Sequence, residues 1–347
     1  MQQGAVGTGT VRAIDFPEEF EPVRIQRPLL KLPIRFCAET LAREVSALPP
    51  SAWMPHPQNF DGNTAVPLVS PGGTVNDDWS GPMAPTEALK RCGYIMEVMR
   101  ELNSTWGRSR LMGLEPGAVV PLHVDVHYYW RTHLRIHIPV ITNPDVGFTC
   151  NEETIHLKAG ECWILDSFYR HSVDNRGSET RIHLVLDTVG SATLWDLMDA
   201  AATASGDDKF VAPGTVPARP LQFEQINAPA VMSPWEMKSH IAYITDWTDP
   251  DPRLEGILRM LDRFVLAWSG TWARFGTSDE GLPQYLSHLT QVRDAIAKLS
   301  GPPVLMRNGM PMLDSLHRYV LGNAVAVAKL RELQAAASRV TQHRATA

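Results

Sequence analysis

Cysteine is scarce in this sequence, and the pattern of a secretion signal does not occur in its first residues. The 347 residues include four cysteines, none of them in a CxxC pair: Cys37, Cys92, Cys150 and Cys162. Such scattered cysteines are typical of free thiols in a protein core, and they argue against a disulfide scaffold. The first twenty residues have no apolar segment followed by a cleavage pattern, so we expect no signal peptide and a cytoplasmic protein.

Long apolar runs and an excess of positive charge are also absent. No run of about 18 apolar residues occurs, so we expect no membrane-spanning helix. The net charge is −6, which argues against a nucleic-acid partner because such partners usually require a basic surface. The phosphate-binding patterns GxGxxG and GxxxxGK[ST] do not occur. Hydrophobic residues make up 44% of the chain, enough for an ordinary globular core.

The first hundred residues predict two helices separated by a long loop. Residues 1–30 are rich in glycine, proline and charge, and we expect an irregular lead-in there. Helical spacing of apolar residues predicts a helix over 38–48. Residues 49–85 are dense in turn formers and predict mostly loop. A second helix is predicted from Thr86 to about Leu102, with one apolar stripe: Leu89, Ile95, Met96 and Met99.

From Arg110 to Thr188 the texture changes to short apolar runs separated by turn signals. The turns include Pro116-Gly117 and Ala159-Gly160, and the runs are RLMGLEP, AVVPLHVDV, THLRIHIPV, TIHLKAG, ECWILD, HSVDN and TRIHLVLDTV. Short strands at this spacing predict a β-sandwich or barrel. A doubly wound α/β domain would need helices between the strands, and the intervals are too short for them.

The last third of the chain predicts helices. LWDLMDAAAT has helical character, residues 205–222 are rich in glycine, proline and aspartate, and three amphipathic segments follow at 253–270, 282–299 and 312–340. We therefore expect a β-domain with a helical lead-in over 1–195 and a helical domain over 196–347. The apolar stripes of these helices suit packing against the β-core or against a second protomer, which would make a homodimer.

The segment HVDVHYYWRTHLRIH, residues 123–137, holds four histidines, two arginines and one aspartate. On a strand, residues i and i+2 point to the same side, so His123 and Asp125 can bind one cation. His171, which begins the run HSVDN, is the candidate third ligand. Two histidines and one carboxylate are the facial triad of non-haem Fe(II) sites, which leaves positions for a chelating cosubstrate and dioxygen. An HxD pair alone recurs often by chance.

Arg181 lies ten residues after His171, in the run TRIHLVLD. A buried arginine in an apolar strand is costly unless an anion pairs with it. Its guanidinium fits a carboxylate in bidentate geometry, so a dicarboxylate cosubstrate is a suitable partner. A structural salt bridge with an aspartate or glutamate is the alternative. His183 would lie on the same side of this strand as Arg181.

These motifs resemble the core of the aspartyl/asparaginyl β-hydroxylase family, which includes bacterial proline cis-hydroxylases. The resemblance covers about residues 108 to 190 and depends on LRIHIPVITNPDVGFTCNEETIHLKAGECWILDSFYRHSVDNRGSETRIHLVLDTV. Members are 2-oxoglutarate- and Fe(II)-dependent oxygenases. The resemblance implies a mainly β core, a double-stranded β-helix of the cupin-like, jelly-roll type. Flanking N-terminal helices and an α-helical C-terminal region complete the expected fold.

The resemblance also assigns roles to six residues. His123, Asp125 and His171 match the Fe(II) ligands. Arg181 matches the arginine that binds the distal carboxylate of 2-oxoglutarate. The last two matches are Arg135 and His137, the R-x-H of LRIHIPV, which correspond to a pair that contacts the carboxylates of cosubstrate and substrate. We therefore expect both residues in the cofactor-binding site.

Three departures from the family pattern qualify this assignment. The animal enzymes lack the acidic ligand that Asp125 supplies here. A serine that helps bind 2-oxoglutarate falls near Met112, which cannot do so, and Arg110 or another group would have to replace it. The stretch between the first ligand and the R-x-H pair is longer than in the animal enzymes, which leaves His127 and His133 as bystanders or substrate contacts.

We therefore expect a hydroxylase that acts on an aliphatic carbon of a free amino acid or small amino-acid derivative. Its cofactors would be Fe(II) and 2-oxoglutarate, and its other partners an amino-acid-like substrate and dioxygen. One alternative is hydroxylation of an aspartyl or asparaginyl side chain in a peptide. The other is a non-catalytic, cupin-like protein that binds a metal or small molecule.

Overall fold

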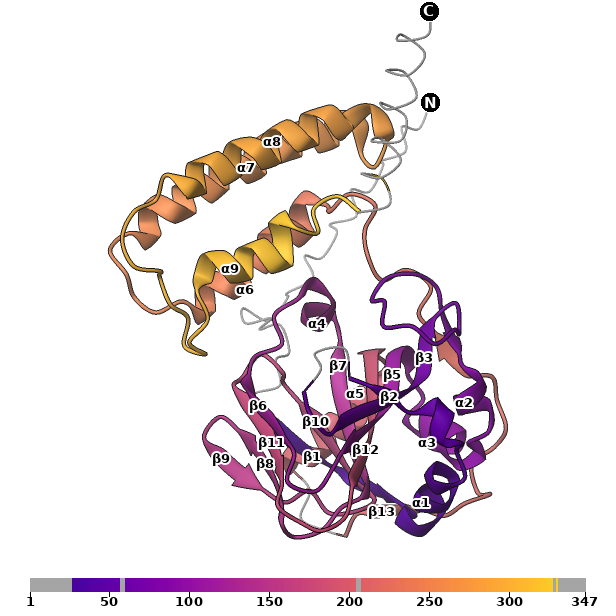
Figure 1. Cartoon of the computed structure of the whole chain (residues 1–347). Coiled ribbons are helices and arrows are strands. Elements are labelled where there is room, and N and C mark those ends of the chain that lie inside the picture. The colour runs from indigo at the N-terminus through magenta and orange to yellow at the C-terminus, as the bar shows by residue number, and fades with distance from the viewer. Residues whose placement is uncertain (1–26, 57–59, 204–206, 327–328, 330–347) are drawn as a thin grey trace, which may run out of the picture.

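The computed structural model describes residues 27–56, 60–203, 207–326 and 329. Most of its strands form one large sheet and one small sheet (Figure 1). In spatial order, the large sheet contains β13 (Lys209–Val211), β1 (Leu29–Phe36), β10 (Glu161–Leu165), β7 (Leu134–Ile141), β12 (Arg181–Gly190), β5 (Thr105–Leu114), β3 (Asn63–Pro71) and β2 (Met54–Pro55). Two short strands extend it: β14 (Gln222–Phe223) pairs with β5, and β4 (Met83–Pro85) pairs with β3.

The small sheet packs against one face of the large sheet. Its order is β6 (Val119–His123), β11 (His171–Asn175), β8 (Val146–Cys150) and β9 (Glu153–Ile155). Phe148 and Val173 of this sheet share a buried cluster with Leu114 and Leu165 of the large sheet. The chain therefore has the mainly β, cupin-like double-stranded architecture that the sequence predicted, with helices around it.

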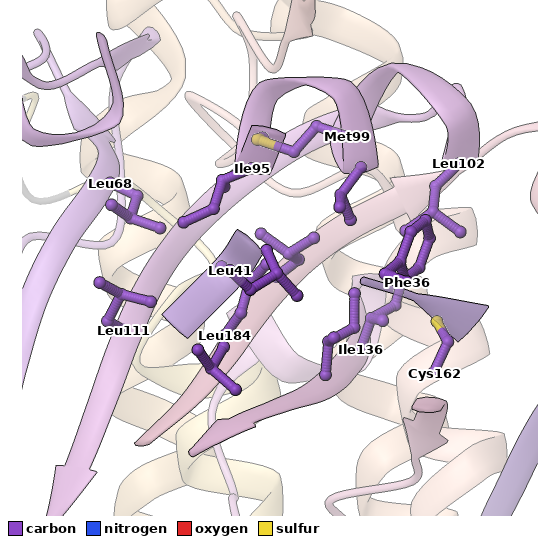
Figure 2. Close-up of a cluster of buried hydrophobic side chains, with 14 of the residues drawn as sticks. Phe36, Leu41, Leu68, Ile95, Met99, Leu102, Leu111, Ile136, Cys162 and Leu184 are labelled. Carbon is purple, nitrogen blue, oxygen red and sulfur yellow. The ribbon is translucent and has the colours of Figure 1, made fainter. Parts of the chain in front are cut away.

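Helices cover the other face of the large sheet. They are α1 (Ala38–Ser46), α2 (Glu87–Lys90), α3 (Gly93–Leu102) and α5 (Ala192–Thr203). Leu41 of α1 and Met99 of α3 contribute to the same buried cluster as Ile136 and Leu184 of the sheet (Figure 2). Because successive residues of a strand point to opposite faces, the residues next to Leu184 on β12 point toward the small sheet instead.

The expected loop over 49–85 is wrong in part, because β2, β3 and β4 lie within it. Pro67 in the middle of β3 argues against a strand in the sequence. In the structure β2 pairs with Thr64 and Ala65, and β4 pairs with Val69 to Pro71. Neither short neighbour pairs with Pro67, so its missing N–H removes no hydrogen bond on that side.

The single helix expected from Thr86 to Leu102 is two helices. Thr86 caps α2 by accepting a hydrogen bond from the backbone N–H of Leu89, and α3 begins at Gly93. The carboxylate of Glu44 in α1 accepts hydrogen bonds from the N–H groups of Tyr94 and Ile95. A helix N-terminus has unpaired N–H groups and favours negative charge, so Glu44 stabilises this second start.

The C-terminal region contains the predicted helices and one that the sequence analysis missed. The missed helix is α6 (Pro234–Trp247). The predicted helices are α7 (Leu254–Phe275), α8 (Leu282–Ala297) and α9 (Met312–Leu316). A short 3-10 turn, Asp279–Gly281, precedes α8, and another, Pro50–Ala52, lies near the N-terminal end of the described chain. After α9 a π-helical turn runs from His317 to Leu321. The predicted helix over 312–340 is thus interrupted at Gly322, and its remainder past 329 lies outside the described residues.

The connector expected over 205–222 is wrong at its ends. β13 pairs with β1 and β14 pairs with β5, so this segment adds two strands to the large sheet. Both strands follow the boundary expected near residue 195. The two-domain division and a homodimer through the helices stay predictions. The lead-in expected over 1–30 lies almost entirely outside the described residues. Within the part of the chain that the structure describes, no helix is long and apolar enough to cross a membrane.

We expect Leu184→Ala to lower the free energy of unfolding by about 2–5 kcal/mol, because Leu184 is fully buried between the sheet and the helices. Val189→Ala is the matched control, since Val189 is on the same strand but is 46% exposed. Urea unfolding followed by circular dichroism measures both. Equal losses in the two variants would contradict the assignment of the core to this face.

Candidate metal centre and its pocket

The small sheet brings the three candidate metal ligands together. His123 is the last residue of β6 and His171 is the first residue of β11, and the antiparallel pairing sets these two residues opposite each other. Their ring centroids are 4.2 Å apart. Asp125 follows β6 by two residues, with a carboxylate oxygen 3.8 Å from His123 Nε2 and the other 4.0 Å from His171 Nε2.

Each imidazole is oriented by a backbone carbonyl. His123 Nδ1 is 2.8 Å from the carbonyl oxygen of Pro121, and His171 Nδ1 is 2.9 Å from that of Tyr169. A carbonyl can only accept a hydrogen bond, so each Nδ1 donates and each Nε2 keeps its lone pair toward Asp125. Metal-binding histidines are characteristically held in this way.

The charges at this site suit a divalent cation. Burial lowers the pKa of His171 to about 4, so its imidazole is neutral at physiological pH. Burial by itself would raise the pKa of Asp125, but Arg135 and the two histidines lower it below the usual value. Two imidazole nitrogens and one carboxylate, with ligand atoms within 4.8 Å of one another, form a donor set that fits non-haem Fe(II).

Arg135 is in direct contact with one of the candidate metal ligands, Asp125. Its Nη1 donates to the second carboxylate oxygen of Asp125 at 2.7 Å, and its Nε donates to Asp187 at 3.2 Å. The guanidinium also lies 3.7 Å from the centre of the Trp130 ring. Its Nη2 has no partner among the described residues. That atom remains for a further acceptor in the pocket.

A pocket opens between the two sheets beside these residues. Its cavity volume is about 140 Å³, and its lining includes residues of both sheets and of the loop before β4: Asp77, Trp79, Arg108, Arg110, Met112, His123, Asp125, Trp130, Arg135, His137, Phe148, His171 and Arg181. The wall formed by the large sheet therefore carries most of the charge. All six residues that the sequence assigned to the site line this pocket.

Arg181 is buried at the start of β12 and has no acidic partner among the described residues. It is 4% exposed, and its Nη2 donates to His183 Nδ1 at 2.5 Å. This contact agrees with the expected placement of Arg181 and His183 on one side of the strand. Burial lowers the pKa of Arg181 to about 9, which leaves the guanidinium charged at neutral pH. A buried cation without a counter-ion is a strong attractor for an anion.

His137 is the second buried residue without a partner. Both of its ring nitrogens lack a hydrogen-bond partner among the described residues, and the ring lies 5.4 Å from that of Phe148. Burial, together with Arg135 and Arg181, lowers the pKa of His137 well below its usual range. A neutral imidazole can donate one hydrogen bond and accept another. The side chain therefore has both capacities available on the pocket wall.

A second pair of buried arginines lies on β5. Arg108 and Arg110 both contact one carboxylate oxygen of Asp77, at 3.2 and 3.3 Å. The Arg108 guanidinium also lies 3.5 Å from the centre of the Trp79 ring. One carboxylate on the loop before β4 thus balances two cations. Burial and the neighbouring Arg108 and Arg135 lower the pKa of Arg110 to about 9.

The remaining histidines of the cluster have structural partners. His127 caps the short helix α4 (Tyr128–Thr132) by accepting a hydrogen bond from the N–H of Tyr129. His133 stacks on the ring of Tyr129 and contacts Glu224 at 3.1 Å. Neither histidine lines the pocket. Their contacts agree with the expectation that some of the cluster would be bystanders.

Sequence reasoning missed Asp187, Arg108, Asp77 and Trp79. Asp187 had a usable signal, because residues 181, 183, 185 and 187 alternate to one side of β12. Arg108 had the same signal on β5, two residues before Arg110. Asp77 and Trp79 are in the segment GGTVNDDWSG, which is rich in turn formers. Such a segment does not indicate where the loop runs or toward which strand its side chains point. Only the tertiary structure brings that loop over the pocket.

The two sheets form a cupin-like core with a candidate metal centre. A family model matches this core. Residues 68–190 match the family model described as Aspartyl/Asparaginyl beta-hydroxylase. This segment is about a third of the chain, and over it the chain is similar to the aspartyl/asparaginyl β-hydroxylase family. The resemblance that the sequence motifs indicated is therefore confirmed, although the matched segment ends well before the C-terminal helices.

Two curated relatives are proline hydroxylases. The chain is 27% identical over 136 residues to an L-proline cis-3-hydroxylase 1 of Streptomyces sp, which covers 35% of this chain and 45% of that protein. It is 25% identical over 115 residues to an L-proline cis-4-hydroxylase of Rhizobium meliloti, covering 33% of this chain and 41% of that protein. The similarity thus spans less than half the length of either relative.

The chain shows a distant likeness to two solved structures. An oxidoreductase of the 2OG-Fe(II) oxygenase family from Burkholderia pseudomallei is 13% identical and has a TM-score of 0.34, over 53% of this chain and 89% of that one. A sugar phosphate isomerase of a cupin superfamily from Silicibacter pomeroyi is 16% identical, with a TM-score of 0.24, over 39% of this chain and 68% of that one.

We expect His171→Ala to weaken binding of a divalent metal by more than the tenfold to hundredfold that the loss of an outer hydrogen-bond partner usually causes. Removing His171 leaves only one imidazole and one carboxylate. His317→Ala is the control, because His317 is an exposed histidine in the π-helical turn. Titration of the metal-free protein with Co(II) under argon, followed by visible absorption, measures both. Unchanged binding by His171→Ala would place the metal elsewhere.

Proposed function

We propose that this protein is a 2-oxoglutarate- and Fe(II)-dependent hydroxylase of a free amino acid or small amino-acid derivative. The proposal rests on one observation: a single pocket contains both a candidate metal site and a buried cation that can bind an anion. At one place the imidazoles of His123 and His171 and the carboxylate of Asp125 converge. At another, the buried guanidinium of Arg181 has no acidic partner among the described residues.

Fe(II) fits the three ligands by their chemistry. His123 and His171 present oriented Nε2 lone pairs, and Asp125 supplies one negative charge. When bound, the iron together with dioxygen and 2-oxoglutarate would supply the oxidation of an aliphatic C–H bond, with succinate and carbon dioxide as by-products. In the same pocket Arg135 holds one oxygen of Asp125, which fixes the direction of the carboxylate.

2-Oxoglutarate fits the remaining cation. The Arg181 fork suits a carboxylate, and the alternative of a structural salt bridge is not supported because its recorded partner is His183. His137 and the free Nη2 of Arg135 lie on the same wall, where each can contact a further carboxylate oxygen. These roles rest on the family resemblance together with the missing partners.

The pocket favours a small carboxylated substrate over a peptide. Its cavity volume is about 140 Å³, which suits a small molecule or one side chain. Arg108 and Arg110 share a single carboxylate, that of Asp77, so this part of the wall has excess positive charge. A free amino acid brings an α-carboxylate to this positive charge. An internal peptide residue has no α-carboxylate, and only an aspartyl or glutamyl residue would bring a side-chain carboxylate instead.

The non-catalytic alternative has less support. A protein that only binds a metal or small molecule does not need an iron site with open positions together with a separate buried arginine. Two curated relatives are proline hydroxylases, and this supports a small amino-acid substrate. The peptide alternative remains an outcome of the substrate experiment below.

We expect 2-oxoglutarate decarboxylation to be stimulated by free amino acids more than by peptides that contain the same residues. The assay measures succinate formed with Fe(II) and ascorbate across a panel of amino acids, their N-acetyl forms and short peptides. The His171→Ala variant is the control for metal-independent background. Stimulation by aspartyl or asparaginyl peptides alone would favour the peptidyl hydroxylase, and no stimulation with any metal-loaded sample would favour the binding protein.

We expect Arg181→Ala to raise the apparent KM for 2-oxoglutarate roughly a hundredfold to several-thousandfold, because breaking one side of a buried ion pair costs on the order of 3–5 kcal/mol. Arg181→Lys keeps the charge but loses the fork, so we expect a smaller rise. Arg176→Ala is the control, since that side chain is 76% exposed.

Co(II) binding should persist in both Arg181 variants, because Arg181 is not among the converging metal ligands. A 2-oxoglutarate titration of succinate formation, with Co(II) affinity measured in parallel, separates the two roles. If Arg181→Ala kept its apparent KM, the anchor would be another arginine, and Arg110 and Arg135 would be tested next.

A further inference from the structure

The loop between β10 and β11, residues 166–170, contacts two of the candidate metal ligands through its backbone. The carbonyl oxygen of Ser167 accepts a hydrogen bond from the N–H of Asp125 at 3.0 Å. The carbonyl oxygen of Tyr169 accepts one from His171 Nδ1 at 2.9 Å. The position of this loop therefore sets both the backbone at Asp125 and the ring plane of His171.

Phe168, the residue between Ser167 and Tyr169, packs its side chain against the C-terminal helices. Phe168 is 3% exposed and lies in the buried cluster of the C-terminal helices. Its ring centroid is 4.9 Å from that of Trp247 and 5.0 Å from that of Tyr243, both on α6. Tyr169 packs on the same Trp247, at 4.8 Å. An aromatic side chain of the β-core is thus inserted among the rings of α6.

A polar contact fixes the same loop from the helical side. Asn308, before α9, is 4% exposed and donates a hydrogen bond from Nδ2 to the carbonyl oxygen of Phe168 at 2.9 Å. Its Oδ1 accepts a hydrogen bond from the N–H of Met310 at 3.1 Å. Because both ends of this buried amide are hydrogen-bonded, the Asn308 side chain has one orientation. Asn308 therefore fixes the position of the Phe168 carbonyl relative to the C-terminal helices.

The chain segment after Asp125 is held by the same cluster. Val126 and Tyr128 are buried with the residues of the C-terminal helices. The Tyr128 hydroxyl donates to the carboxylate of Glu236 on α6, and its ring packs against His240. The helices therefore contact both segments that carry the candidate ligands, although no residue of α6 to α9 lines the pocket.

We propose that the C-terminal helices act as a clamp on the metal centre, with Phe168 and Asn308 as its positioning residues. This inference rests on the proposed metal site. Holding Phe168 between the rings of α6 and its carbonyl on Asn308 keeps the carbonyls of Ser167 and Tyr169 in place. Those carbonyls in turn keep Asp125 and His171 in the geometry that binds the metal. The helices thus serve affinity for the metal, in addition to burying apolar surface.

The test compares two variants of the clamp with two matched controls in the full-length protein. Phe168→Leu shortens the inserted side chain, and Phe264→Leu makes the same change at a residue of α7 that is 5% exposed and lies in the same cluster. Asn308→Ala removes the contact to the loop. Thr271→Ala removes a buried hydroxyl that contacts His288 within the helices.

The measurements are Co(II) affinity and the visible spectrum of bound Co(II), at a temperature where circular dichroism shows all four variants folded. We expect Phe168→Leu and Asn308→Ala to bind Co(II) about tenfold or more weakly, as is typical when outer partners of metal ligands are lost. Phe264→Leu and Thr271→Ala should stay within about twofold of the parent, even where their melting temperatures fall equally.

The outcomes separate this inference from the proposed function. If the parent protein bound no Co(II), or bound it equally well after His171→Ala, the metal site itself would be wrong. If the parent bound Co(II) through His171 but the clamp variants matched their controls, only the clamp would be overturned. Should Phe168→Leu fail to fold, Asn308→Ala alone decides, because it removes no apolar volume from the cluster.

Discussion

The register between β6 and β11 is the constraint on which the site depends. It sets His171 opposite His123 at the end of the small sheet, with their rings 4.2 Å apart. A shift by one residue would turn His171 to the other face of the strand and separate the two imidazoles. The register between β11 and β6 shifts between His171 and Val173. The His171–His123 pair is therefore out of register with the rest of this ladder.

The charge of the pocket follows from a similar constraint on the large sheet. β5, β7 and β12 are adjacent, and each directs alternate residues toward the small sheet. Asp187 is opposite Arg135, which explains why that arginine can be buried beside Asp125. Among the residues that the structure describes, Arg181 has no acidic neighbour of this kind. One arginine is thus neutralised by the protein, and the other is left for a ligand.

The sequence predicted those parts of the site that depend on strand periodicity or on a motif. His123, Asp125, His171 and Arg181 line one pocket, as the motif and its spacing led us to expect. Strand periodicity explains the side to which Arg181 points, but Asp125 lies two residues past the end of β6, so its position depends on the loop. β3 was missed because Pro67 and the turn formers around it conceal the pairing with β5. Asp77 could not be placed, because a loop that crosses to another strand has no periodicity.

The backbone contacts to the metal ligands were beyond any sequence pattern. The carbonyls of Ser167 and Tyr169 carry no side-chain signal, and the run DSFYR reads only as a turn. The residue between them, Phe168, accepts a hydrogen bond from Asn308, which is 140 residues away along the chain. The family match ends at residue 190. Under the proposed clamp, residues outside the segment that matches the family model set part of the affinity of this site for metal. Two proteins with identical ligands can then differ in how tightly they bind the ion.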